Sequence, residues 1–264
     1  MSEQLTPTAL EQAQEDNKVQ RGWTAVWEMA ARYHRYQVEG LEHVLQDPND
    51  RKASLIVGYH GRLLAVDLCI LSVKLRKHLG YFPHCFLHKQ LKAIPGAEEA
   101  MESIGFVTGD DGDVERAVAN GEHLILPPGG AWEGMRTFKD NNKVHWPSTG
   151  YIYMALKHGL DIIPVGCAGA DETYIGLLHG EKIVRRLGVS SKWAWAPWTG
   201  IGPLGLYPFS PPFPAKLYQV IGEPIPTGHV NILDREEVMA LHEQVKQAVQ
   251  DLLDEARVKR EKRL

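Results

Sequence analysis

The sequence has few cysteines and no long apolar run, and these absences exclude several classes of protein. Its three cysteines are odd in number and form no C-x-x-C pair, which argues against a disulfide framework or a zinc site and favours a reducing compartment. No stretch reaches the length of about 18 consecutive apolar residues that a membrane-spanning helix needs. Residues 1–22 lack a basic segment followed by an apolar one, so we expect no signal peptide. We therefore expect a cytoplasmic protein without a metal site, which can still lie on a membrane surface.

A large excess of charge of either sign is also missing. The chain has 29 Lys and Arg against 33 Asp and Glu, a net charge of −4, which argues against the nucleic-acid backbone as its main partner. Apolar residues make up 44% of the 264 residues, and no long polar tract interrupts them. This composition excludes extensive disorder and is sufficient for one sizeable hydrophobic core.

Apolar strands alternate with helices along most of the chain. Strand-like runs lie at residues 37–41, 53–57, 84–87, 123–126, 161–165 and 216–221, and helical patterns at about 19–36, 63–79, 98–104, 114–119, 148–158 and 234–259. This alternation predicts an α/β fold with a mainly parallel sheet flanked by helices. We expect an N-terminal helical segment over residues 1–36 and a single α/β domain over residues 37–264.

Several familiar motifs are absent or present only in appearance. Gly200–Gly205 has the glycine spacing of a dinucleotide-binding loop, but the proline-rich segment 206–212 cannot begin the helix that such a loop requires. No G-x-S-x-G nucleophile elbow occurs anywhere in the chain. His84 and His88 lie four residues apart without a third ligand at convincing spacing, so we interpret them as loop or core histidines.

One histidine occupies a position typical of catalysis. His60 follows the apolar run 53–57 and precedes Gly61 and a predicted helix, which places it at the carboxyl end of a strand, where open α/β sheets bind ligands. A neutral imidazole there can take a proton from a hydroxyl near pH 7. Asp67, the one acid among the ten residues that follow, is the candidate to orient the ring. Taken alone, the same pattern fits an ordinary loop histidine.

A second cluster follows another apolar strand, between Leu126 and Arg136. Gly129 and Gly130 allow backbone N–H groups to approach a ligand closely. Arg136 offers a planar cation for a phosphate or carboxylate, and Glu133 can anchor or orient that cation. We therefore expect these four residues to bind substrate.

In this order and spacing, the motifs resemble the glycerolipid and lysophospholipid acyltransferases. The resemblance runs from about residue 37 to residue 255, and the matching pieces are Gly58–Gly61, Lys89–Gly96, Pro127–Arg136 and Ile162–Gly166, flanked by Val38–Glu42 and Gly222–Pro226. The sequence motifs Gly-Tyr-His-Gly and Gly-Gly-Ala-x-Glu are most similar to those of the diacylglycerol-acyltransferase-related branch. The resemblance implies a glycerol-phosphate-acyltransferase-like fold.

The resemblance also implies a reaction. His60 would be the general base that transfers an acyl group from acyl-CoA or an acyl-carrier protein directly to a lipid hydroxyl, with Asp67 as its partner and no further cofactor. N–H groups near Gly129 and Gly130 would stabilise the oxyanion. Contact with a membrane surface is expected through the aromatic segment 193–213, the amphipathic helix at 19–36 or the basic C-terminus, although each of these can instead be packed or solvated.

Two departures from the family pattern affect the substrate. Six residues separate His60 from Asp67, where the family usually has four, so a direct hydrogen bond needs an additional loop before the helix begins. The segment 105–110 has no basic residue where the family usually carries an arginine for a phosphorylated acceptor. Unless Arg62 or Arg116 compensates, we expect a neutral alcohol to be accepted at least as well as lysophosphatidate. A lysophosphatidate acyltransferase, a thioesterase and a non-catalytic lipid-binding protein remain alternatives.

Overall fold

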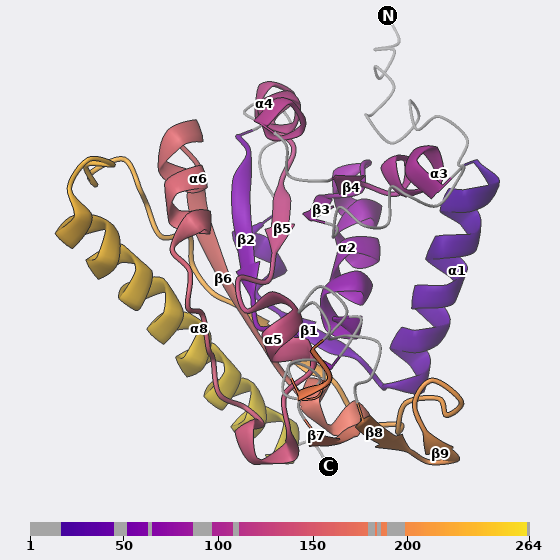
Figure 1. Cartoon of the computed structure of the whole chain (residues 1–264). Coiled ribbons are helices and arrows are strands. Elements are labelled where there is room, and N and C mark those ends of the chain that lie inside the picture. The colour runs from indigo at the N-terminus through magenta and orange to yellow at the C-terminus, as the bar shows by residue number, and fades with distance from the viewer. Residues whose placement is uncertain are drawn as a thin grey trace, which may run out of the picture.

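The computed structural model describes residues 17–44, 52–62, 65–86, 97–107, 111–178, 183, 186–188 and 199–262. Its centre is a seven-stranded sheet with the order β1-β10-β6-β2-β5-β3-β4 (Figure 1). The strands are β1 (Gln37–Glu39), β2 (Ser54–Gly58), β3 (His84–Phe86), β4 (Phe106–Val107), β5 (Leu124–Leu126), β6 (Asp161–Ala168) and β10 (Tyr218–Ile221). In this described sheet, every neighbouring pair is parallel except β6 with β10. The expected α/β architecture with a mainly parallel sheet is confirmed.

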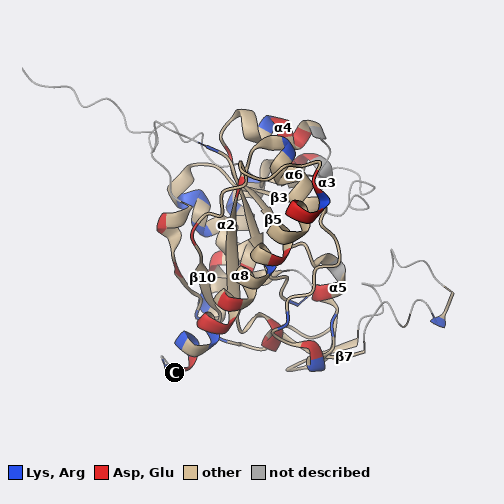
Figure 2. Ribbon diagram, turned by 90° about the vertical axis from the view of Figure 1, so that its left-hand side faces the viewer, with Lys and Arg blue, Asp and Glu red and all other residues tan. Residues whose placement is uncertain are grey.

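Helices cover both faces of this sheet, as Figure 1 shows. They are α1 (Lys18–Tyr33), α2 (Val66–Leu79), α3 (Ala97–Ser103), α4 (Asp111–Ala119), α5 (Gly130–Gly134), α6 (Gly150–His158) and α8 (Arg235–Lys262). Helices α1, α2 and α3 pack on one face, and α4, α6 and α8 pack on the other. Charged residues of both signs are distributed over the helices and loops that surround the strands (Figure 2).

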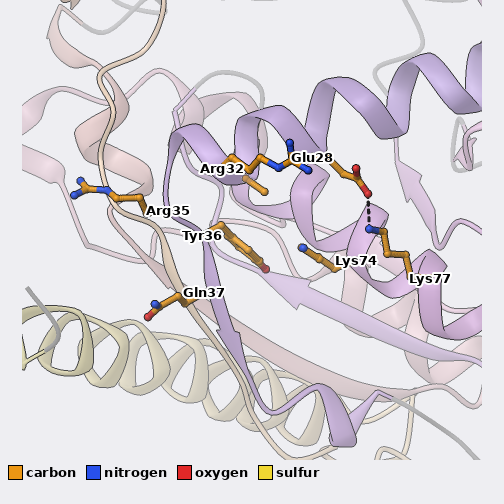
Figure 3. Close-up of a pocket in the computed structure, with 8 residues that line it drawn as sticks. Glu28, Arg32, Arg35, Tyr36, Gln37, Lys74 and Lys77 are labelled. Atoms are coloured by element: carbon orange, nitrogen blue, oxygen red, sulfur yellow. Dashed lines mark ion pairs between the residues drawn. The ribbon is translucent and has the colours of Figure 1, made fainter.

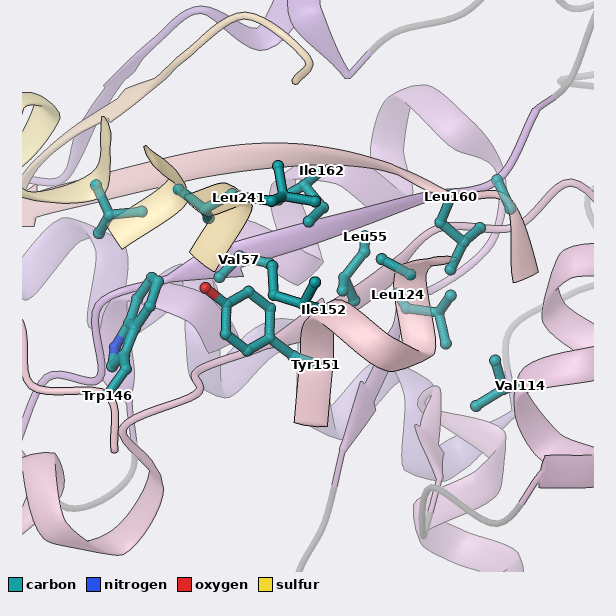
Figure 4. Packing of buried hydrophobic residues seen from close by; sticks show 14 of the residues in the cluster. Leu55, Val57, Val114, Leu124, Trp146, Tyr151, Ile152, Leu160, Ile162 and Leu241 are labelled. Atoms are coloured by element: carbon teal, nitrogen blue, oxygen red, sulfur yellow. The ribbon is translucent and has the colours of Figure 1, made fainter. Parts of the chain in front are cut away.

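The central strand β2 shows how the sequence builds both layers. Leu55 and Val57 belong to the core beneath α6 and α8, where Ile152 and Leu241 meet them (Figure 4). Ile56 points to the opposite face and joins the core beneath α2. Because successive side chains of a strand alternate between faces, a strand buried on both faces is apolar over most of its length.

The ends of the predicted helices are set by local contacts. Asn17 and Gln20 form a reciprocal capping box at the start of α1, each side chain accepting the other's backbone N–H. Asp234 caps α8 by accepting the N–H groups of Glu236 and Glu237 at 2.9 and 3.2 Å. Helix α2 begins at Val66, three residues later than the pattern indicated, and follows a left-handed Ala65.

The N-terminal helix is packed into the domain. Trp27 and Ala31 of α1 are buried in a cluster with Ile70 of α2 and Cys167 of β6. The predicted helix is therefore confirmed over 18–33, whereas the domain boundary at residue 36 stays a prediction.

A second sheet was not expected from the sequence. It is antiparallel and contains β7 (Ile175–Leu178), β8 (Thr199–Gly202) and β9 (Gly205–Leu206). The glycines with dinucleotide-loop spacing form the β8–β9 hairpin and begin no helix, which confirms the interpretation of that motif. Of the aromatic segment 193–213, residues 193–198 lie outside the described residues.

Candidate active site

The site lies at the edge of the sheet where three parallel strands end. Strands β6, β2 and β5 are neighbours with the same direction, so the segments that follow them meet at one edge. These segments are residues 59–62, 127–136 and 169–173. The structure thus brings His60, Glu133 and Arg136 together.

The backbone of His60 is held from both sides. Its N–H donates to Glu133 Oε2 at 3.0 Å, and its carbonyl accepts a hydrogen bond from Arg136 Nη2. The imidazole, half-buried, donates from Nδ1 to the carbonyl of Gly61 at 2.6 Å. Because a carbonyl only accepts, Nδ1 carries the proton and Nε2 of the neutral ring keeps a lone pair.

Electrostatics favour the neutral form of His60. Burial lowers its pKa below the usual 6.5, an effect that the bond to Gly61 and the charge of Asp171 partly oppose. At pH 7 the ring is therefore an unprotonated base rather than a cation. Its position and protonation state both suit proton abstraction from a hydroxyl.

Glu133 lies on the short helix α5, and its carboxyl group joins two segments of the chain. Oε2 accepts the N–H of His60, and Oε1 accepts the N–H of His145 at 2.8 Å. Burial raises the pKa of Glu133 to about 8, although both N–H groups favour the charged form. A Cβ at Gly129 would lie 2.1 Å from Glu133 Cδ, so this position must be glycine for the carboxyl group to reach His60.

The second glycine of this motif has a different role. Gly130 has a φ of +48° and donates its N–H to the carbonyl of Pro127 at 3.0 Å. It therefore closes the turn that begins α5. An oxyanion contact by Gly129 stays a prediction, and the N–H of Gly130 is already engaged by the protein.

Arg136 is fully buried, with 0% of its surface exposed, and its guanidinium is surrounded by protein groups. Nε donates to the Glu133 carbonyl at 2.5 Å, while the Nη atoms donate to the hydroxyl of Tyr59 and the carbonyls of His60 and Lys143. The guanidinium also lies over the ring of Tyr59, 4.1 Å from its centroid. This geometry favours a role in positioning His60 over the substrate contact that the sequence suggested.

Sequence reasoning missed the acid that neutralises this arginine. Asp171, buried in the 3₁₀ helix Ala170–Thr173, accepts hydrogen bonds from the Tyr59 hydroxyl and, at 2.7 Å, from the N–H of Asn142. Its Oδ1 lies 3.5 Å from Arg136 Nε and 3.7 Å from Arg62 Nε. The sequence did contain a signal for this residue, because Asp171 is an acid just beyond β6, the third of the neighbouring strands.

The small sheet closes over these two arginines. Arg62 donates to the carbonyl of Arg136 and to Oδ1 of Asn141. A Cβ at Gly176 of β7 would lie 2.4 Å from the Arg136 carbonyl and 2.7 Å from Arg62 Nη1. Only glycine allows β7 to pack so closely, and this packing excludes water from the guanidinium groups.

Asp67, the predicted hydrogen-bond partner of His60, lies beside Gly61, the residue that follows His60 in the chain. A Cβ at Gly61 would be 2.8 Å from Asp67 Oδ1, and in the described structure no hydrogen bond joins Asp67 to His60. Neither carboxyl oxygen of this buried side chain has a hydrogen-bond partner among the described residues, and burial raises its pKa to about 7. The long spacing is accommodated because α2 begins only at Val66.

Part of the family resemblance cannot be placed. The segment 89–96 and residues 108–110 lie outside the described residues. The catalytic role of His60 and the substrate contacts of the second motif stay predictions.

Comparisons with known proteins place the chain among lipid acyltransferases. Residues 17–263 match the family model for diacylglycerol acyltransferase. The chain is 28% identical over 233 residues to the human "DGAT1/2-independent enzyme synthesizing storage lipids", covering 88% of this chain and 63% of that protein. It is 25% identical to chloroplastic phytyl ester synthase 2 of Arabidopsis thaliana, covering 78% and 32%, and 23% identical to human diacylglycerol O-acyltransferase 2, covering 90% and 64%.

The chain spans about three fifths of the length of the storage-lipid relatives it matches, with 63% of the human protein covered. Among solved structures it is similar to the 1-acyl-sn-glycerophosphate acyltransferase PlsC of Thermotoga maritima. The TM-score is 0.52 at 17% identity, covering 93% of this chain and 86% of that one. This likeness supports the fold, with the sheet and flanking helices described above.

Proposed function

This chain belongs to the diacylglycerol acyltransferase family, and from that membership we propose that it transfers a fatty acyl group from an acyl thioester to the hydroxyl of a lipid. The observation that carries the proposal is the state of His60. Its backbone is fixed by Glu133 and Arg136, its Nδ1 proton is held by Gly61, and its Nε2 lone pair remains for a substrate proton. A base held in this way suits general-base catalysis.

In the proposed reaction, His60 Nε2 takes the proton of the acceptor hydroxyl as its oxygen attacks the thioester carbonyl. A new C–O bond forms and a tetrahedral oxyanion results. The C–S bond then breaks, and the leaving thiolate takes the proton back from the imidazolium of His60. The reaction is therefore balanced in protons and electron pairs, and it requires no covalent acyl-enzyme, added oxidant or metal ion.

We assign Asp67 a supporting role in this cycle. Its carboxyl group lies against Gly61, the residue whose carbonyl holds the His60 Nδ1 proton. When His60 becomes an imidazolium, an ionised carboxylate so close in the chain's interior stabilises the added positive charge. Asp67 is thus proposed to act on His60 through the field of its charge and through the Gly61 loop.

We further propose that the acceptor is a neutral alcohol. Arg136 is fully buried and its guanidinium already bonds protein groups, so it is not available to a substrate phosphate. Neither alternative cation is free, because Arg62 is buried beside Asp171 and Arg116 pairs with Asp113 at 3.1 Å. Diacylglycerol and the alcohol of a phytyl ester, which appear in the relatives' names, carry no phosphate.

Access to such substrates is proposed at a membrane surface, with the protein peripheral on its cytoplasmic side. The outer face of α1 exposes Val26 and Met29, and the loop around β9 exposes Leu204 and Phe209, the latter with 90% of its surface accessible. Tyr33 links these regions, since its hydroxyl donates to the Pro212 carbonyl at 2.7 Å. In Figure 1, α1 lies on the right and β9 at the lower right. None of the helices described is long and apolar enough to cross a bilayer.

The proposed reaction is tested by thiol release from acyl-CoA, measured with and without monoacylglycerol, diacylglycerol or a long-chain alcohol. Release that depends on the acceptor, with formation of the ester, supports acyl transfer. Release that is independent of the acceptor indicates a thioesterase. No release with any acceptor, from a folded protein that binds lipid, indicates a binding protein and overturns the proposal.

A further inference from the structure

A pocket of 390 Å³ opens between α1 and α2, outside the acyl-transfer site. It is lined by Glu28, Ala31, Arg32, Arg35, Tyr36, Gln37, Lys74 and Lys77 (Figure 3). Its volume lies within the range of small-molecule sites, about 300–1,000 Å³. Four of its eight lining residues are cationic and one is acidic, whereas the whole chain has a net charge of −4.

Three of the four cationic side chains lie around Glu28, whereas Arg35 points away from them (Figure 3). Lys77 pairs with Glu28, the contact drawn as a dashed line in Figure 3. The pKa of Glu28 is lowered by the hydrogen bond from Lys77 and by the charges of Lys77, Lys74 and Arg32. Three cations therefore act on one carboxylate, which leaves positive charge uncompensated within the pocket.

Two of the remaining cations are placed by the fold. Lys74 is half-buried on α2, and within the described part of the chain no carboxylate forms an ion pair with it. Arg35, in the turn after α1, donates one hydrogen bond to the Pro214 carbonyl at 3.2 Å and keeps further N–H donors. Convergent cations at the wall of a cavity are the arrangement that binds phosphate oxygens.

We propose that this α1–α2 pocket is a binding site for a phosphate-bearing anion. Its shared chemistry is a phosphate or pyrophosphate group, which can belong to the head group of an anionic phospholipid or to a soluble nucleotide such as coenzyme A. The pocket has four cationic residues and one acidic residue, and this excess of positive charge suits a ligand with more than one negative charge. The inference rests on the pocket alone and goes beyond acyl transfer, because binding there requires neither His60 nor a reaction.

The fold places this pocket near the edge of the sheet that carries His60. Gln37, which lines the pocket, pairs with Tyr218, which pairs with Ala168 at the end of β6. Strands β10 and β6 separate β1 from β2, so at about 4.8 Å per strand the two lie about 14 Å apart. A phosphate held in the pocket thus lies within reach of an extended lipid or thioester whose other end is at His60.

The experiment has a soluble arm and a vesicle arm, both without acyl donor or acceptor. Isothermal titration at low salt measures inorganic pyrophosphate and adenosine 3′,5′-bisphosphate, and co-sedimentation compares phosphatidylcholine vesicles with and without phosphatidylglycerol. The test variants are Arg32→Gln, Lys74→Gln and their combination. Arg21→Gln is the matched control, since Arg21 is exposed on the same helix outside the pocket.

We expect the wild type to bind in at least one arm. The affinity of the double variant should be lower by a factor of about ten or more, because two charged contacts are lost. The control should stay within about twofold of the wild type. Binding in the soluble arm identifies a nucleotide-type phosphate, and binding only to phosphatidylglycerol vesicles identifies a lipid head group. Absence of binding in both arms, or an equal loss in Arg21→Gln, overturns the proposal whatever the acyltransferase assay shows.

Discussion

Glu133 holds the backbone of His60: its Oε2 accepts the N–H of His60 at 3.0 Å, and its Oε1 accepts the N–H of His145 at 2.8 Å. A carboxyl group that is buried and shared in this way fixes the direction in which the imidazole leaves the strand. It reaches His60 because position 129 is glycine. The glutamate of the second motif therefore acts on the histidine of the first.

We predict that Glu133→Gln lowers kcat with little change in KM. The amide offers only one acceptor oxygen, so the N–H of His60 or of His145 loses its partner and the imidazole moves. A displacement near 1 Å can cost about a hundredfold in rate. Glu122→Gln is the control, because Glu122 bonds His84 away from the site. A variant with normal kcat and an unchanged acid limb of its pH–rate profile would contradict the positioning role.

Asp171→Asn should destabilise the fold. The change leaves the buried guanidinium groups of Arg62 and Arg136 without their counter-charge, and breaking a buried ion pair on one side typically costs about 3–5 kcal/mol. Urea unfolding followed by circular dichroism measures the loss. Asp251→Asn, on the exposed surface of α8, should stay within about 0.5 kcal/mol of the wild type. Equal stability of the two variants would show that the arginines do not depend on Asp171.

Asp67 should make the free energy of unfolding depend on pH. Its pKa rises from 3.8 to about 7 on folding, so between these values the unfolded chain has lost a proton that the folded chain keeps. Stability contributed by this group therefore falls as the pH rises through this window, by up to about 4 kcal/mol. Asp67→Asn removes the effect and should be more stable than the wild type at pH 8 but not at pH 3. A difference between the two proteins that is constant with pH would refute the assignment.

The acceptor preference follows from the burial of Arg136. We predict that kcat/KM for monoacylglycerol at least equals that for lysophosphatidate with the same acyl donor, because Arg136 is buried and bonds protein groups instead of a phosphate. Steady-state assays with both acceptors in matched mixed micelles measure the ratio. A hundredfold preference for lysophosphatidate, which corresponds to about 2.7 kcal/mol, would restore the phosphorylated acceptor.

Much of the fold was predictable because its strands are buried on both faces. The runs at 53–57, 123–126 and 161–165 are mostly apolar, and each is a central strand that begins within one residue of its predicted start. The position of His60 at a strand end followed directly. The strands β7 to β9 were not predicted, since they are short and glycine-rich without a periodic apolar pattern, and β7 pairs with a strand distant in sequence.

The roles of the site residues were harder to predict than their proximity. Sequence reasoning placed Arg136 near Glu133 but could not show that its guanidinium turns inward, because that depends on Asp171, 35 positions further along the chain. Likewise, the spacing from His60 to Asp67 left open whether the intervening residues were helical. Ala65 in a left-handed conformation settles that α2 begins only at Val66.

The central claim, that His60 is the general base, is tested most directly by acceptor-dependent thiol release from acyl-CoA in His60→Ala. The control is His158→Ala, because His158 is half-buried at the end of α6, beside the start of β6 and so at the opposite edge of the sheet from His60. We predict a loss of about 100- to 10,000-fold in kcat for His60→Ala, with unchanged circular dichroism and a fully active control. Near-normal turnover by folded His60→Ala would contradict the account.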